Sequence, residues 1–106
     1  VAEGKLTAMA GSGPGFADMK AAYDAIEDVR KDLFAYVDLG INPNIKLEAE
    51  SKVGNWVPAG AVTLGMGNNL WAGGDNSVPY QEDISLQGST VTMDGKVIVE
   101  NGELKL

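Results

Sequence analysis

The chain has 106 residues, of which fifteen are acidic and eight basic, so its formal net charge is −7. This charge balance repels phosphate backbones and anionic membranes, so we expect neither nucleic acid nor a membrane surface as a partner. The length suits a single domain over residues 1–106, and the absence of cysteine excludes disulfides and fits the reducing cytoplasm.

The first ten residues are typical of a strand with a turn near its start, at Glu3-Gly4. Two interpretations of this pair stay open. As a hairpin turn it would pair with a strand before Val1, which would make the chain a C-terminal fragment of a longer protein. As a chance Glu-Gly pair it has no such consequence.

A glycine-rich breaker segment leads into a predicted amphipathic helix, from about residue 16 to residue 33. Apolar residues recur there at steps of three and four, which predicts one face packed in the core: Phe16, Met19, Tyr23, Ile26, Val29 and Leu33. Charged residues occupy the other faces, and the helix spacing predicts the pairs Lys20–Asp24 and Glu27–Lys31.

Strand character follows in residues 34–39 and 61–66, and the second of these is small and apolar enough to be buried on both faces. Between them, residues 46–52 fit a short helix or an extended connection equally well. Trp56 is expected to pack the neighbouring loop down.

Towards the C-terminus, three further segments alternate as strands do, at residues 84–86, 89–93 and 97–99. Asp94-Gly95 and Asn101-Gly102 suit the two-residue turns of hairpins. Together the elements predict an α+β fold with a mixed or mostly antiparallel sheet and one main helix.

The segment 60–83 is where we expect a site, because long loops between strands usually carry function. An apolar strand enters a loop rich in glycine and asparagine, residues that suit turns and left-handed backbone. Trp71 and Asp75 are the candidate ligand-binding residues of this loop. Packing of Trp71 beneath the loop is the alternative, since large aromatic side chains are usually buried.

Four carboxylates are the acidic candidates for a site: Asp38, Asp75, Glu82 and Asp83. Two carboxylates on separate segments hold a hard cation such as Mg²⁺ or Ca²⁺ weakly and make a poor zinc centre. The alternative is that all four are surface acids on an acidic chain.

Several landmarks are spread in order over nearly the whole chain. They are Glu3-Gly4-Lys5, a helix, the run from Asp38 to Pro43 with its Leu-Gly-Ile and Asn-Pro, Gly60 before a strand, Gly73-Gly74, Asn76-Ser77 and the strand pair around Asp94-Gly95. In their order and spacing the chain resembles the C-terminal part of the aminopeptidase T and aminopeptidase S family of two-metal aminopeptidases.

The resemblance implies a pair of divalent metal ions held by histidines and acids. Placed on this chain, the family's strand histidine falls on Thr63, its tyrosine on Leu70 and its second histidine on Tyr80. The acid positions fall on Asp38 and Glu82, which become the metal ligands by resemblance. The chain contains no histidine, and a catalytic metal needs about three protein ligands, so no catalytic residue is expected here.

The resemblance therefore predicts a non-catalytic or incomplete peptidase-like domain. The alternative is a module that binds a small ligand or a peptide and has no hydrolase activity. The partners these interpretations allow are a peptide, an upstream domain of the same protein, or a second copy in a homodimer.

Overall fold

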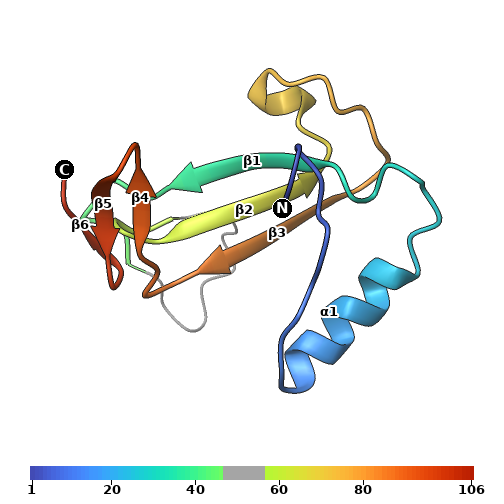
Figure 1. The fold of residues 1–106 in the computed structure, drawn as a ribbon, viewed down its shortest axis with the longest axis horizontal. Helices are drawn as coiled ribbons and strands as arrows, with labels where there is room; N and C mark the ends of the chain where they lie inside the picture. Colours follow the sequence, from blue (N-terminus) through green and yellow to red (C-terminus); the bar gives the residue numbers. More distant parts are fainter. Residues whose placement is uncertain (47–56) are drawn as a thin grey trace. The chain divides into compact units, whose positions relative to one another are not determined.

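The structure, a computed structural model, describes residues 1–46 and 57–106 and has an α+β fold. Within these residues it contains one α-helix, one 3₁₀ turn and two three-stranded sheets (Figure 1). Their bounds are α1 Pro14–Asp24, β1 Phe34–Leu39, β2 Val62–Gly67, η1 Leu70–Ala72, β3 Gln81–Leu86, β4 Val91–Met93, β5 Lys96–Glu100 and β6 Glu103–Leu104. Trp56 and the segment 46–52, apart from Lys46, lie outside the described residues.

The two sheets have the strand orders β1-β2-β3 and β4-β5-β6, so strands adjacent in sequence are also adjacent in space. The arrows of β1, β2 and β3 alternate in direction in Figure 1, and β5 pairs antiparallel with both β4 and β6. The predicted α+β class with a mostly antiparallel sheet is confirmed. In the described part of the chain, no helix is long and apolar enough to cross a membrane.

The chain divides into two compact units, which we call unit 1 (Val1–Tyr36 and Gly65–Glu82) and unit 2 (Val37–Leu64 and Asp83–Leu106). Unit 1 buries Met66 and Val78, and unit 2 buries Ala61, Val62, Ile98 and Val99. Each unit therefore has a small apolar core of its own.

Helix α1 is shorter than predicted, because it ends at Asp24 and not near residue 33. The prediction of a face packed in the core is wrong: no residue of α1 is buried, and beyond the helix Val29 is 92% exposed. The Lys20–Asp24 pair forms, with 2.6 Å between ammonium and carboxylate, since it lies within the helix. The Glu27–Lys31 pair does not form; the Lys31 ammonium instead lies 4.8 Å from the centre of the Tyr23 ring.

A local turn around Asp28 takes over after the helix has ended. The Asp28 carboxylate accepts hydrogen bonds from the backbone N–H of Arg30, at 2.8 Å, and from its guanidinium. These bonds with Arg30 hold the pKa of Asp28 at about 2, well below its usual range. A side chain that bonds its own backbone two residues on competes with helical hydrogen bonding, which is why the apolar periodicity overestimated the helix.

The two predicted hairpin turns, and the Glu3-Gly4 pair whose role was left open, are two-residue turns with left-handed backbone. Their first residues, Glu3, Asp94 and Asn101, have φ values of 51°, 49° and 50°, and a glycine follows each. Ala2 and Lys5 form an antiparallel bridge across the first of these turns, so Glu3-Gly4 is a turn between residues of this chain.

Strand β2 is almost entirely buried, as its small apolar sequence predicted. The chain just before β2, in unit 2, is tightly packed. A Cβ at Gly60, where φ is +85°, would lie 1.9 Å from the Gly102 carbonyl oxygen. Glycine at this position therefore supplies both a left-handed backbone and the room for two chain segments to meet.

Candidate functional site

The loop between β2 and β3, residues 68–80, is fastened to β1 by asparagine side chains of unit 1. The Asn69 amide donates to the Ala35 carbonyl, at 3.0 Å, and accepts from the Asn76 N–H, at 2.8 Å. The Asn76 amide donates in turn to the Phe34 carbonyl, at 3.1 Å. A loop tied by side-chain bonds to a strand presents its surface residues in one arrangement.

A further asparagine shapes the start of the same loop. Asn68 donates to the Val78 carbonyl and accepts from the Leu70 N–H, at 3.2 and 3.1 Å. The prediction that the loop asparagines adopt left-handed backbone is wrong. Among the described residues other than glycine, positive φ occurs only at Glu3, Asp94 and Asn101. The loop uses its asparagines as hydrogen-bonding side chains because buried backbone groups need partners.

Trp71 lies on the 3₁₀ turn η1 at the surface of unit 1, with 64% of its residue surface exposed. Packing beneath the loop is thus wrong for this residue. The indole N–H donates to the Gln81 side-chain oxygen at 3.0 Å, and the ring meets Tyr36 edge to face with 5.1 Å between centroids. Trp71 is therefore exposed to solvent and yet held on two sides, as a ligand-stacking residue needs to be.

Gly65 on β2 leaves room for the Tyr36 ring because it has no side chain. A Cβ at this glycine would lie 2.1 Å from a carbon of the Tyr36 ring, so the ring lies directly over the glycine. Our interpretation that the loop glycines supply backbone freedom does not hold at this position, where φ is not positive. The missing side chain is what lets Tyr36 reach Trp71.

Thr63, the position that the family resemblance equates with a metal-binding histidine, is 6% exposed in unit 2. Its hydroxyl shares a hydrogen bond with the Ser85 hydroxyl, with 3.1 Å between the oxygens. A buried threonine hydroxyl engaged in this bond does not supply the imidazole nitrogen that the resemblance implies for a metal site.

The other two positions that the resemblance equates with site residues lie in unit 1. Leu70 is 51% exposed beside Trp71 on η1. The Tyr80 hydroxyl lies 3.4 Å from the Arg30 carbonyl, to which it donates, and burial raises the pKa of this phenol, with smaller effects from the charges of Asp32 and Asp28.

The predicted metal ligands Asp38 and Glu82 and the candidate ligand-binding Asp75 all have exposed side chains. Within residues 1–46 and 57–106, no group of three or more histidine, cysteine or acidic side chains is arranged to hold a metal ion. The donor set that a catalytic divalent ion requires is therefore not assembled by the described residues.

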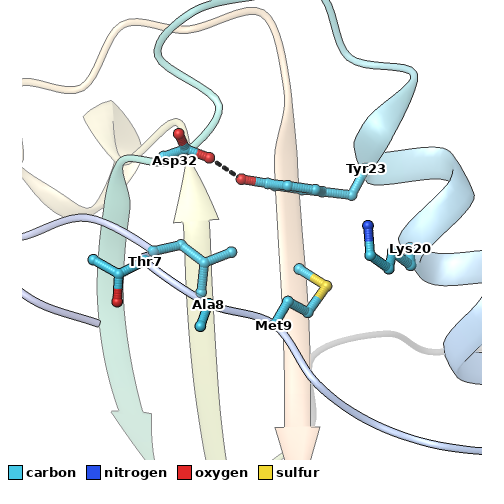
Figure 2. A pocket seen from close by; sticks show the side chains of 7 residues that line it. Thr7, Ala8, Met9, Lys20, Tyr23 and Asp32 are labelled. Atoms are coloured by element: carbon cyan, nitrogen blue, oxygen red, sulfur yellow. Dashed lines mark hydrogen bonds between the residues drawn. The ribbon is translucent and has the colours of Figure 1, made fainter.

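A pocket of about 260 Å³ lies elsewhere in unit 1, and the sequence patterns did not indicate it. It is lined by residues 6–9, Lys20, Tyr23 and Asp32 (Figure 2). Backbone bonds place the N-terminal segment beside the chain before β1, from the Leu6 N–H to the Asp32 carbonyl at 2.7 Å and from the Phe34 N–H to the Gly4 carbonyl at 2.9 Å. The pocket therefore depends on contacts between segments far apart in sequence.

The Tyr23 side chain is the central feature of this pocket. Its hydroxyl donates a short hydrogen bond to the Asp32 carboxylate, and the Met9 side chain faces it in Figure 2. Burial, and then the bond to Asp32, raise the pKa of Tyr23 well above its ordinary value of 10.0. Tyr23 was predicted as a core residue of a long helix, and its spacing did not indicate the hydrogen bond to Asp32.

The Tyr23–Asp32 bond leads to a prediction about stability at alkaline pH. Because the folded-state pKa of Tyr23 is raised, its contribution to stability is complete below pH 10 and is lost as the pH rises above 10. We expect the free energy of unfolding to fall more steeply above pH 10 in the wild type than in Tyr23→Phe. Urea denaturation followed by circular dichroism from pH 8 to pH 11.5 measures both slopes, and equal slopes would contradict the expectation.

Comparisons of the chain with protein-family models, with curated proteins and with solved structures find no match in any of the three. The resemblance to the aminopeptidase T and aminopeptidase S family accordingly rests on the sequence landmarks alone.

Proposed function

We propose that this chain is a peptidase-like domain without hydrolase activity, and that it binds a short peptide at the loop 68–80 through Trp71. The observation that carries the proposal is the state of Trp71: its indole is mostly exposed, and Tyr36 and Gln81 hold it in place. An aromatic ring fixed before binding loses little conformational entropy when a ligand stacks on it.

The residues beside Trp71 favour a peptide over a sugar as the ligand. Leu70 adds exposed aliphatic surface next to the indole, which suits an apolar side chain. Asp75 follows in the same loop with an exposed carboxylate, and the chain as a whole carries a net charge of −7. The proposed ligand is therefore a peptide with an apolar residue and a positive charge.

The loss of hydrolase activity is supported by Thr63 and by the acids. The Thr63 hydroxyl is engaged with Ser85, and Asp38 and Glu82 are exposed carboxylates on different strands. Two carboxylates fall short of the roughly three ligands of a catalytic metal ion.

Fluorescence of Trp71 tests the binding proposal. The chain has two tryptophans, so a Trp56→Phe background leaves Trp71 as the only indole. We expect a lysine-containing apolar tripeptide to change its emission, and Trp71→Ala to weaken binding by at least about tenfold in calorimetry, because an aromatic anchor carries much of the binding energy.

The matched control is Met93→Ala, which removes another exposed apolar side chain, 60% exposed on β4, and is expected to leave affinity unchanged. The glutamate-containing counterpart of the tripeptide should bind more weakly, and maltotriose should not bind. Unchanged emission with every peptide would sink the proposal.

Hydrolysis is tested on the same protein after dialysis against Zn²⁺, Co²⁺ or Mn²⁺. We expect neither stoichiometric metal nor cleavage of leucyl anilide. Bound metal together with turnover would show a working aminopeptidase and would overturn the non-catalytic part of the proposal.

A further inference from the structure

The pocket lined by Tyr23 has opposite charges at the two ends of one side chain. The Asp32 carboxylate lies at the hydroxyl end of Tyr23, where it accepts the phenolic hydrogen bond. Lys20 lies one helical turn before Tyr23 on α1, and its ammonium is at the other end of the ring (Figure 2). The pocket therefore has a carboxylate at one end and, at the other, an ammonium that is also paired with Asp24.

Both charged groups keep hydrogen-bonding capacity for a ligand. Within the described part of the chain, Tyr23 is the only side chain bonded to the Asp32 carboxylate, through one of its two oxygens. The Lys20 ammonium has three donors and gives one to Asp24, at 2.6 Å. A carboxylate oxygen can thus accept from a ligand, and two ammonium hydrogens can be donated to one.

Apolar groups line part of the pocket, and the volume of the pocket is limited. Leu6, Ala8, Met9 and the Tyr23 ring supply the apolar surface, and the volume of about 260 Å³ lies just below the range of roughly 300–1,000 Å³ typical of sites for larger small molecules. The pocket suits a ligand of about the size of one amino acid.

We propose that this pocket binds a small zwitterion, a free α-amino acid with an apolar side chain. Its ammonium donates to Asp32, its carboxylate accepts from Lys20, and its side chain lies against Met9. A simple amine would leave the two remaining Lys20 donors without a ligand acceptor, and a simple carboxylate would meet the like charge of Asp32. Only a ligand with both charges satisfies both ends.

The test uses L-leucine and two analogues that each lack one charge. 4-Methylpentanoate lacks the ammonium group, and 3-methylbutylamine lacks the carboxylate. By calorimetry and by amide shifts in ¹⁵N-labelled protein, we expect L-leucine to bind and to shift residues 6–9 and Tyr23. Each analogue should bind at least about tenfold more weakly, because each loses a charge-assisted hydrogen bond.

Substitutions in the protein test the same two charges from the side of the pocket. Asp32→Asn and Lys20→Met should each lower the affinity for L-leucine by at least about tenfold. In Asp32→Asn the side-chain amide oxygen can still accept the hydrogen bond from the Tyr23 hydroxyl, so the fold is preserved. Asp18→Asn on α1 and Lys96→Met on β5 remove equivalent charges outside the pocket and should leave affinity unchanged.

The inference is overturned if L-leucine does not bind, or if Asp32→Asn and Lys20→Met leave its binding intact. The Trp71→Ala variant separates this site from the proposed peptide site, since in calorimetry it should weaken tripeptide binding by at least about tenfold and leave L-leucine binding unchanged. Loss of L-leucine binding in Trp71→Ala would place the amino acid at the loop 68–80 and would contradict the assignment to the pocket.

Discussion

Replacing Gly60 with alanine is expected to destabilise the protein by about 3 kcal/mol. Left-handed backbone costs an alanine about 1–2 kcal/mol, and forcing atoms into a packed site costs about 1–3 kcal/mol more. Both apply here, because φ is +85° and the new Cβ would lie 1.9 Å from the Gly102 carbonyl oxygen. The neighbour is backbone of a hairpin, so it cannot move aside as a flexible side chain would. Urea denaturation followed by circular dichroism measures the loss.

Gly95→Ala is the matched control for this prediction. Gly95 also lies in unit 2 with φ of +79°, but its Cβ would meet nothing within 4 Å. We expect this variant to lose about 1–2 kcal/mol of unfolding free energy, the cost of left-handed backbone alone. Equal losses at Gly60 and Gly95 would show that the close approach to Gly102 contributes nothing.

Gly65→Ala is expected to have the second large effect, and to act on binding as well as on stability. The new Cβ would lie 2.1 Å from the Tyr36 ring, which must then leave its position over the glycine. Displacement of Tyr36 removes the edge-to-face support of Trp71. We expect a loss of about 1–3 kcal/mol in unfolding free energy and at least about tenfold in tripeptide affinity at Trp71.

A double-variant cycle with Tyr36→Ala checks this mechanism. If the clash with the ring is the cause, Gly65→Ala should cost clearly less stability in the Tyr36→Ala background than in the wild type. The same loss in both backgrounds would place the effect in the backbone of β2 and not at the ring. Tripeptide affinity should be low in both Tyr36→Ala proteins, since neither supports Trp71.

The elements predicted correctly are those whose cause is local in sequence. Asp94-Gly95 and Asn101-Gly102 form hairpin turns because glycine tolerates the left-handed backbone that such turns require. Strand β2 is buried because a run of small apolar residues suits burial on both faces. These features need no information about the rest of the chain.

The end of α1 was predicted wrongly for a reason that is also local but lies outside the apolar pattern. The spacing of apolar residues predicted a helix that reaches Leu33, but α1 ends at Asp24. Beyond it the Asp28 carboxylate accepts a hydrogen bond from the Arg30 N–H, and the chain forms a turn. Hydrophobic spacing describes which face an element buries and says little about where side-chain bonding stops it.

For the loop 68–80, the sequence indicated Trp71 as a candidate but left its exposure open. Indole surface is usually buried, and only the folded chain brings Tyr36 and Gln81 to the ring and leaves the rest of it in solvent. The role of Gly65 was equally out of reach, since a glycine's cross-strand neighbour is set by strand register.

What the sequence by itself determined is the α+β class, the hairpin turns, the buried strand β2 and the lack of histidine and cysteine chemistry. Each follows from the conformational preference or the functional groups of residues read where they stand. The tertiary structure alone decided that Thr63 pairs with Ser85, that Trp71 is exposed on a fastened loop, and that Lys20, Tyr23 and Asp32 line one pocket. Contacts of this kind join residues separated along the chain, and their geometry is fixed only when the chain packs.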